Sequence, residues 1–287
     1  MKISILSCLF WRYPLERVFQ IASLHGYDGV EISGAREHAY VYDMTDARCE
    51  EILSWKEKYG VEVSMFSPEI MMYPYNIPTS SAKERRDTID YLKKAIEVAR
   101  KIETPRIQLT IGHAGHGSDR KKNLENATNV MRILCDHAEK YGIDLVVEAL
   151  TIMESNTVVM LDDYLEMLEK IDSPCLKGMI DTVMPMVNWE VYSDYFDKLG
   201  DKLTYIHFED TTGYTEIHQP MGKGILDIRE FLGILRRRGY DGWLSFELIS
   251  KYIREPEMFS GQELRAMRHY LDLTKDVQKM TIQEEAK

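Results

Sequence analysis

The sequence predicts an α/β protein that forms a single (β/α)8 TIM barrel, and three observations lead to this prediction. Apolar segments alternate with segments of helical periodicity, and eight such pairs account for the 287 residues from end to end. Strands joined by helices run parallel, because each crossover returns the chain to the same edge of the sheet. No G-x-G-x-x-G motif follows the first strand, which disfavours an open, doubly wound sheet. Eight parallel units close into a barrel, so we expect one domain over residues 1–287.

The first four strand–helix pairs are recognised by periodicity and by the residues at their ends. Apolar and β-branched residues predict strands near 3–7, 29–32, 61–66 and 106–111. Helical periodicity predicts helices near 14–25, 47–59, 80–101 and 121–141. Pro14 suits the first turn of its helix, since a proline lacks the N–H that would be unpaired there. Ile89, Leu92, Ile96 and Ala99 give the third helix an apolar face.

The last four strands are apolar runs that each end in an ionisable residue. The residues at these ends are Glu148, Asp181, His207 and Glu247. Helices are predicted to follow near 162–171, 190–199, 227–237 and 261–277. The tail from Lys275 onward is expected to be a solvated segment.

Composition excludes several classes of function. A hydrophobic content of 44% with 29% charged residues is ordinary for a soluble globular protein. The net charge of -11 repels phosphate backbones and anionic lipids, so we expect neither nucleic-acid nor membrane binding. The four cysteines form no C-x-x-C pair, which favours a reducing compartment. No apolar run approaches the roughly 20 residues of a membrane span, and we expect a cytoplasmic protein.

The four strand-end residues predict a metal centre. In a closed barrel, residues that end consecutive strands lie side by side, so Glu148, Asp181, His207 and Glu247 are expected to converge on one point. Three carboxylates cannot crowd together unless a cation neutralises them. Three oxygen ligands and one imidazole suit Mn²⁺ first, then Mg²⁺ or Co²⁺, with Zn²⁺ as a further candidate.

The same residues suggest a reaction. A metal at this site would act as a Lewis acid on a carbonyl, and removal of the neighbouring proton would yield a metal-stabilised enediolate. Glu148 and Glu247 lie at the two ends of the row of four strand-end residues around the barrel mouth. They are therefore expected to face opposite sides of that planar intermediate. Two bases across a plane serve an epimerase, whereas an aldose–ketose isomerase can use one shuttling base.

Several stretches of the chain match a known superfamily. They are Tyr73-Pro74-Tyr75-Asn76, His113-Ala114-Gly115, Glu148 with Glu154-Ser155-Asn156, residues 195–203, and Gly239-Tyr240. On these stretches the chain resembles the xylose-isomerase-like, or endonuclease-type, TIM-barrel superfamily of sugar isomerases and epimerases, over nearly all of its length. Within it, the chain is most similar to the fructoselysine 3-epimerase branch. The resemblance implies a divalent-metal-dependent 3-epimerase that acts on a small-molecule ketose or ketoamine sugar.

The resemblance also implies roles for individual residues. The metal ligands would be Glu148, Asp181, His207 and Glu247, and the two glutamates would also be the catalytic bases. The substrate-binding residues would be Glu154, His218, His113 and Tyr73. Relatives often form dimers or tetramers, so a homo-oligomer is expected by analogy alone.

One departure from the superfamily pattern bears on the alternatives. Ketohexose epimerases and the endonuclease branch carry a histidine three residues after the strand-six aspartate, where this chain has Met184. An endonuclease-type phosphodiesterase is therefore disfavoured. An epimerase or isomerase of a free ketohexose or a pentulose phosphate remains open, because the glycine-rich loop 112–117 could present N–H groups to a phosphate. A sugar-binding barrel without catalysis is a further alternative.

Overall fold

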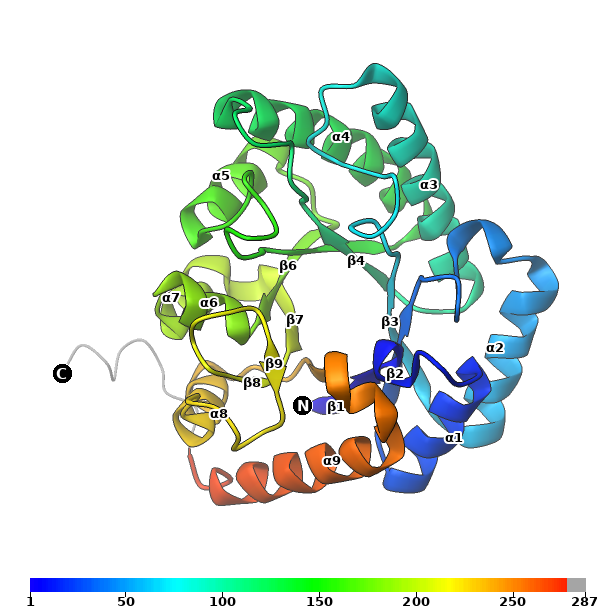
Figure 1. Cartoon of the computed structure of the whole chain (residues 1–287), viewed down its shortest axis with the longest axis vertical. Helices are drawn as coiled ribbons and strands as arrows, with labels where there is room; N and C mark the ends of the chain where they lie inside the picture. The colour runs from blue at the N-terminus through cyan, green and yellow to red at the C-terminus, as the bar shows by residue number, and fades with distance from the viewer. Residues whose placement is uncertain (278–287) are drawn as a thin grey trace.

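The computed structural model describes residues 1–277, and it confirms the predicted closed parallel barrel (Figure 1). Most of the tail expected beyond Lys275 lies outside the described residues. The barrel strands are β1 (Lys2–Leu6), β2 (Gly29–Ser33), β3 (Glu62–Ser67), β4 (Arg106–Thr110), β5 (Asp144–Glu148), β6 (Leu176–Asp181), β7 (Leu203–His207) and β10 (Trp243–Phe246). Neighbouring strands are consecutive in the chain, and β10 closes the barrel against β1.

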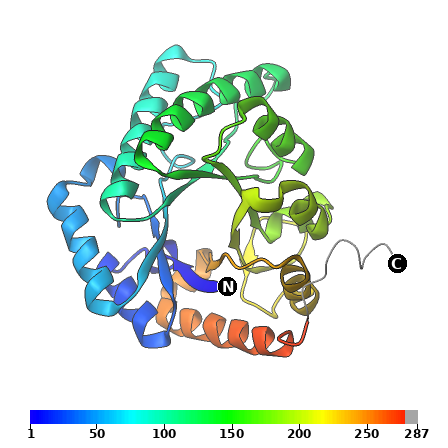
Figure 2. The same ribbon diagram turned by 180° about the vertical axis from the view of Figure 1, so that it is seen from behind.

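A ring of helices encloses the barrel in both views (Figure 2). They are α1 (Leu15–His25), α2 (Asp46–Tyr59), α3 (Ala82–Lys101), α4 (Arg120–Tyr141), α5 (Leu161–Ile171), α7 (Tyr192–Leu199), α8 (Ile228–Arg238) and α9 (Pro256–Leu273). Short 3₁₀ segments are η1 (Ser7–Phe10), η2 (Val41–Asp43), η3 (Gly200–Lys202) and η4 (Ser250–Arg254). Figure 2 shows the end of the barrel where the N-terminus lies.

Side-chain caps mark where several of these helices begin. Thr45, Ser81, Asp119 and Asp227 each accept a hydrogen bond from the backbone N–H three residues later. Each cap pairs one of the backbone N–H groups that a helix start leaves without a partner. These caps explain why the predicted starts of α2, α3, α4 and α8 are correct to within one or two residues.

Three elements differ from the sequence prediction. Helix α9 begins at Pro256, five residues before the predicted start, because a proline is well suited to the first turn. A short helix α6 (Val183–Asn188) follows β6 directly. A two-stranded hairpin, β8 (Asp210–Thr211) with β9 (His218–Gln219), lies in the β7–α8 connection. Two-residue strands are too short to produce a periodic signal in the sequence.

The barrel interior has an apolar layer directly beneath the strand-end residues. Val146, Met179, Tyr205 and Trp243 are buried together with Met65. The first three lie two residues before Glu148, Asp181 and His207, and side chains two residues apart in a strand point to the same side. The strand alternation that fills the barrel therefore also directs the ionisable residues inward at its mouth.

Helix α5 is fixed to the strands that carry two of these acids. The hydroxyl of Tyr164 donates to the backbone oxygens of Val147, at 2.9 Å, and Lys177, at 3.1 Å. A Cβ at Gly178 would lie 2.1 Å from that hydroxyl, so only glycine fits there. This contact sets the position of β5 and β6 immediately before Glu148 and Asp181.

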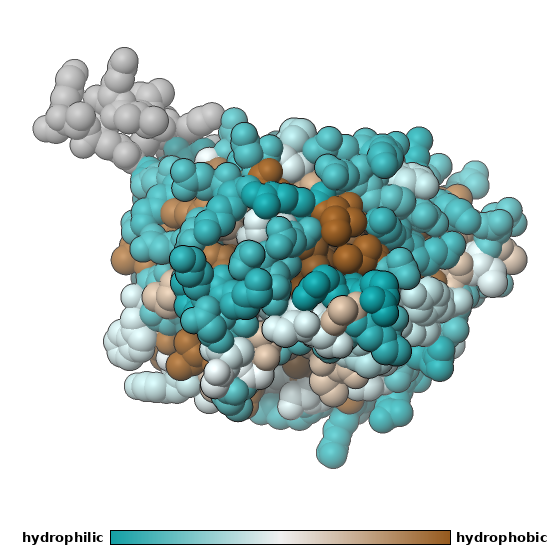
Figure 3. Space-filling view, turned by 90° about the horizontal axis from the view of Figure 1, so that it is seen from above, coloured by the Kyte–Doolittle hydropathy of each residue, from teal (hydrophilic) through white to brown (hydrophobic). Residues whose placement is uncertain are grey.

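The outer surface is that of helices facing water. Figure 3 looks down on the molecule from above the view of Figure 1 and shows mostly hydrophilic residues, with a small group of hydrophobic residues near the centre and single ones elsewhere. Isolated exposed apolar residues are normal on a folded protein. Within residues 1–277, no helix combines the length and the apolar character that crossing a membrane requires.

Glu263 joins α9 to the β9–α8 loop through a buried contact. Its carboxylate accepts a hydrogen bond from the backbone N–H of Met221, at 3.0 Å. Burial raises the pKa of Glu263 to about 7, although this hydrogen bond opposes the shift. The pKa of Glu263 is higher in the folded protein than in the unfolded chain. Its favourable contribution to the free energy of unfolding is therefore fully present below pH ~4.5 and is lost as the pH rises through about 7.

We expect Glu263→Gln to be more stable than the wild type at pH 8, and the advantage to vanish by about pH 4.5. The change in pKa from 4.5 in the unfolded chain to about 7 in the folded protein corresponds to roughly 3 kcal/mol as an upper bound. Urea unfolding at several pH values measures the difference. Glu50→Gln, on the exposed side of α2, is the control and should show no pH-dependent difference. A constant difference between Glu263→Gln and wild type at all pH values would contradict the prediction.

Candidate functional site

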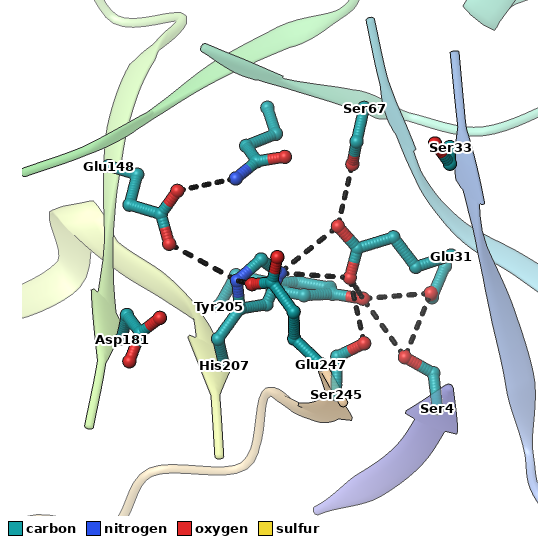
Figure 4. A network of polar contacts seen from close by, with 12 residues as sticks. Ser4, Glu31, Ser33, Ser67, Glu148, Asp181, Tyr205, His207, Ser245 and Glu247 are labelled. Carbon is teal, nitrogen blue, oxygen red and sulfur yellow. Dashed lines mark hydrogen bonds and ion pairs between the residues drawn. The ribbon is translucent and has the colours of Figure 1, made fainter. Parts of the chain in front are cut away.

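Four ionisable side chains meet at the carboxyl end of the barrel, as the sequence predicts. Glu148 ends β5, Asp181 ends β6, His207 ends β7 and Glu247 follows β10. Each offers one ligand atom, and these atoms all lie within 4.8 Å of one another. Figure 4 shows Glu148, Asp181 and Glu247 around His207. The predicted convergence of these four residues is thus confirmed.

His207 lies at the centre of this group and is fully buried. Its Nδ1 is 3.1 Å from Oε1 of Glu148 and 2.7 Å from Oε2 of Glu247. Its Nε2 points the other way and lies 3.1 Å from both carboxylate oxygens of Glu31. Nδ1 is therefore the ring nitrogen that faces the acidic group.

The crowding of negative charge is visible in the pKa values. Burial raises the pKa of Glu148 to about 7; attraction to His207 opposes this shift, and repulsion from Glu247 and Asp181 adds to it. Burial alone would lower the pKa of His207, but Glu31, Glu247 and Glu148 raise it well above its usual value. A carboxyl group with a pKa near neutrality can both accept and release a proton at pH 7.

These four side chains could hold a divalent cation. Three carboxylates and one imidazole are a donor set for a hard or borderline metal such as Mn²⁺. Without a cation, the buried carboxylates repel one another and draw protons to Glu148 and His207. The charge balance and the donor types therefore both fit a metal.

Sequence reasoning did not identify Glu31, which lies on β2 across the barrel from His207. Besides His207, its carboxylate accepts hydrogen bonds from the hydroxyls of Ser67, Ser245 and Tyr205 (Figure 4). Burial would raise the pKa of Glu31, but His207 and the hydroxyls of Ser67 and Ser245 lower it. The signal that could have found it is an acid within the apolar run 29–32.

A second group of buried ionisable residues lies beside the first. Asp181, Glu209 and His218 also bring their ligand atoms within 4.8 Å of one another. Nε2 of His218 lies 3.3 Å from Oδ2 of Asp181. Oε1 of Glu209 accepts the backbone N–H of Glu247, at 2.5 Å. Glu209 therefore fixes the backbone at Glu247, a role that its position two residues after His207 does not reveal.

A cavity opens above the four residues. Glu148, Asp181 and Glu247 line it, together with Glu154 and His218, two of the predicted substrate-binding residues. Glu154 comes from the β5–α5 loop, where its carboxylate accepts a hydrogen bond from the Thr151 hydroxyl at 3.2 Å. Burial raises the pKa of Glu154. His218 reaches the cavity because the β8–β9 hairpin folds over the barrel mouth (Figure 1).

Tyr73 and His113, the other two predicted substrate-binding residues, do not line this cavity. The Tyr73 hydroxyl accepts a hydrogen bond from the backbone N–H of Arg36, at 2.8 Å, and its ring packs edge-on against Tyr40. Nδ1 of His113 accepts the backbone N–H of Gly115. Both side chains hold loops in place, so the geometry gives no support to a substrate contact by either of them.

Two methionines contribute to the cavity wall. Met184 occupies the position where related branches carry a histidine, and it is buried at the cavity. Met71 lies on the β3–α3 loop and is 44% exposed. Its neighbour Met72 is 80% exposed. The cavity lining therefore includes flexible apolar side chains as well as acidic ones.

A family model described as a xylose isomerase-like TIM barrel matches residues 19–270. The chain belongs to this family, as the resemblance of its motifs predicts. It is 34% identical over 271 residues to the fructoselysine 3-epimerases of Shigella flexneri and Escherichia coli O157:H7. Each alignment covers 94% of this chain and 98% of the relative. The chain is accordingly an epimerase, and hence an isomerase.

Solved structures agree with the fold. A D-tagatose 3-epimerase-like protein superposes with a TM-score of 0.82 at 19% sequence identity. The superposition covers 96% of this chain and 99% of the other. At this level of identity, the similarity concerns the barrel architecture.

We expect Mn²⁺ to raise the Tm of the metal-free protein, because a ligand that binds only the folded state stabilises it by about 2.7 kcal/mol at 100 times its Kd. His207→Gln replaces the central imidazole and should lose most of that increase. His137→Gln, on the half-buried side of α4, is the matched control and should keep it. Differential scanning fluorimetry measures the shifts, and an equal increase in both variants would refute the assignment.

Proposed function

We propose that the protein is a divalent-metal-dependent 3-epimerase of a ketose or ketoamine sugar, with a fructoselysine-like ketoamine as the leading substrate. One observation carries the proposal: Glu148 and Glu247 both approach Nδ1 of His207 at the floor of a cavity. The 34% identity to fructoselysine 3-epimerases supports the substrate class.

The chain's own residues account for the proton transfers. One of the two glutamates removes the proton next to the substrate carbonyl, and the other returns a proton to the opposite face of the planar enediolate. The amide of Gln108 donates to Oε2 of Glu148, at 2.6 Å, and so orients that carboxylate. Glu209 fixes the backbone at Glu247. When bound by Glu148, Asp181, His207 and Glu247, a divalent cation would supply Lewis-acid polarisation of the carbonyl.

The charge of the cavity favours a cationic ketoamine over a sugar phosphate. Glu69 and Glu154 line the cavity in addition to the three acids of its floor. Among the described residues, no lysine or arginine lines it. The protonated amine of a ketoamine is attracted by this arrangement, whereas a phosphate group is repelled. The loop 112–117 does not reach the cavity wall, so it offers no phosphate cradle there.

The remaining alternatives have less support. A phosphodiesterase of the endonuclease type would need further metal ligands, and the cavity has Met184 where that branch has a histidine. A barrel that only binds sugar has no need for two carboxylates beside one imidazole nitrogen. An epimerase of a free ketose is the second candidate, and steady-state kinetics with both kinds of substrate separate it from the first.

Incubation of fructoselysine in D₂O with Mn²⁺ should introduce deuterium at C3, because the abstracted proton is replaced from solvent. Glu148→Gln and Glu247→Gln should each lower kcat by about 10²- to 10⁴-fold, the usual contribution of a general acid–base group. Exchange is followed by ¹H NMR at saturating metal, with EDTA-treated enzyme as the negative control.

Glu139→Gln, on the solvent side of α4, is the control variant and should exchange at the wild-type rate. Undiminished deuterium exchange by the EDTA-treated enzyme would contradict the proposed dependence on a divalent metal. Wild-type exchange rates in Glu148→Gln and Glu247→Gln would contradict the assignment of these two glutamates as the catalytic bases.

Glu69→Gln should lower kcat/KM for fructoselysine by up to about fivefold and leave a free ketose unaffected, because a partly exposed charge pair contributes about 0.2–1 kcal/mol. The substitution keeps an oxygen for the hydrogen bond from the backbone N–H of Met72. Steady-state kinetics with fructoselysine, fructose and ribulose 5-phosphate provide the test. Higher kcat/KM for a free ketose than for fructoselysine would favour the second candidate.

A further inference from the structure

Glu31 makes an unusual set of contacts for a carboxylate inside a barrel. It is 0% exposed, and both of its oxygens lie 3.1 Å from Nε2 of His207. Ser67 donates to Oε1 at 2.6 Å, whereas Ser245 and Tyr205 donate to Oε2 at 2.7 and 3.0 Å. Five polar contacts from three other strands therefore hold one buried carboxylate in a single orientation.

The hydroxyl donors are themselves fixed. The Tyr205 hydroxyl also lies 3.0 Å from the hydroxyl of Ser4 and 2.8 Å from that of Ser64. These serines are on β1 and β3, so the network spans the barrel from β7 to β2 (Figure 4). A fully satisfied buried network of this kind is rigid, because every displacement would leave a polar group without a partner.

The geometry indicates which nitrogen of a metal-binding His207 keeps its proton. A carboxylate only accepts hydrogen bonds, so Nε2 must be the donor toward Glu31. When a cation is bound among the acids, Nδ1 is the nitrogen that faces it beside Glu148 and Glu247 and supplies the lone pair, so the remaining ring proton is on Nε2. With a cation bound, the opposite tautomer would place a lone pair against the Glu31 carboxylate and a proton against the cation, and both contacts are repulsive.

We propose that Glu31 is a positioning residue that holds the His207 ring and its Nε2–H tautomer, so that Nδ1 is presented to a divalent metal ion. The proposal rests on the metal centre of the proposed function and adds a residue outside the ligand set. Glu31 does not reach the cavity, so it acts on the reaction only through His207. An anionic partner behind a ligating imidazole also increases the basicity of the ligand nitrogen.

The test is Glu31→Gln, which keeps the side-chain shape and one acceptor oxygen but removes the charge. We expect its Kd for Co²⁺ to increase by about 10- to 100-fold, the usual effect of losing such a partner. The visible absorption of bound Co²⁺ should change as well, because the imidazole is no longer held in one orientation. Glu263→Gln is the matched control: it alters a buried carboxylate away from the barrel interior and should bind Co²⁺ as the wild type does.

A second readout needs no metal. In the metal-free wild type, the Nε2–H of His207 should give a downfield, slowly exchanging ¹H resonance, because it donates to a buried carboxylate. In Glu31→Gln this resonance should move upfield. If the wild type binds no Co²⁺, the proposed metal centre fails, but the resonance still reports whether Glu31 holds His207.

An unchanged Kd together with an unchanged resonance in Glu31→Gln would overturn the proposal. Should that variant fail to fold, Tyr205→Phe replaces it, since this change removes only the hydroxyl that donates to Oε2 of Glu31. We expect Tyr205→Phe to weaken Co²⁺ binding in the same direction by a smaller factor. Wild-type values for both readouts in Tyr205→Phe would likewise overturn the proposal.

Discussion

Electrostatic repulsion among buried carboxylates is the constraint on which the rest of this structure depends. Glu148, Asp181 and Glu247 meet within a few ångströms at the mouth of a barrel that excludes most of the water. Only a positive charge at their centre makes such an arrangement stable, and the imidazole of His207 or a bound cation can supply it. Burying His207 also buries the polar network behind it. Burial of these polar groups costs free energy unless each of them is hydrogen-bonded.

Strand alternation explains how the fold meets this constraint. The apolar layer of Val146, Met179, Tyr205 and Trp243 fills the barrel, and the next inward position along these strands is where the polar residues lie. Inward-pointing side chains of the same strands thus form first the apolar core and then the polar site. A shift of one residue in any of these strands would turn its ionisable side chain out of the barrel.

The loops around the cavity determine which substrate reaches the strand-end acids at its floor. Glu69 and Met71 approach from the β3–α3 loop, Glu154 from the β5–α5 loop and His218 from the β8–β9 hairpin. Their chemistry is acidic and apolar, which suits a sugar that carries a cationic arm better than it suits a phosphorylated sugar. The floor defines the type of reaction, and the loops provide the selection among substrates.

Periodicity and the residues at the strand ends are enough to predict the barrel, its eight parallel strands and the four residues that converge at its mouth. These features are periodic or repeated at strand ends, and parallel strands in a closed barrel leave little freedom in where those ends meet. Other contacts become evident only in the folded chain: Glu31 supports His207, Glu209 fixes the backbone at Glu247, and Tyr73 contacts Arg36 and not the cavity. Those contacts join residues far apart in the chain through side-chain geometry, and no local pattern in one sequence encodes which distant partner a polar group will find.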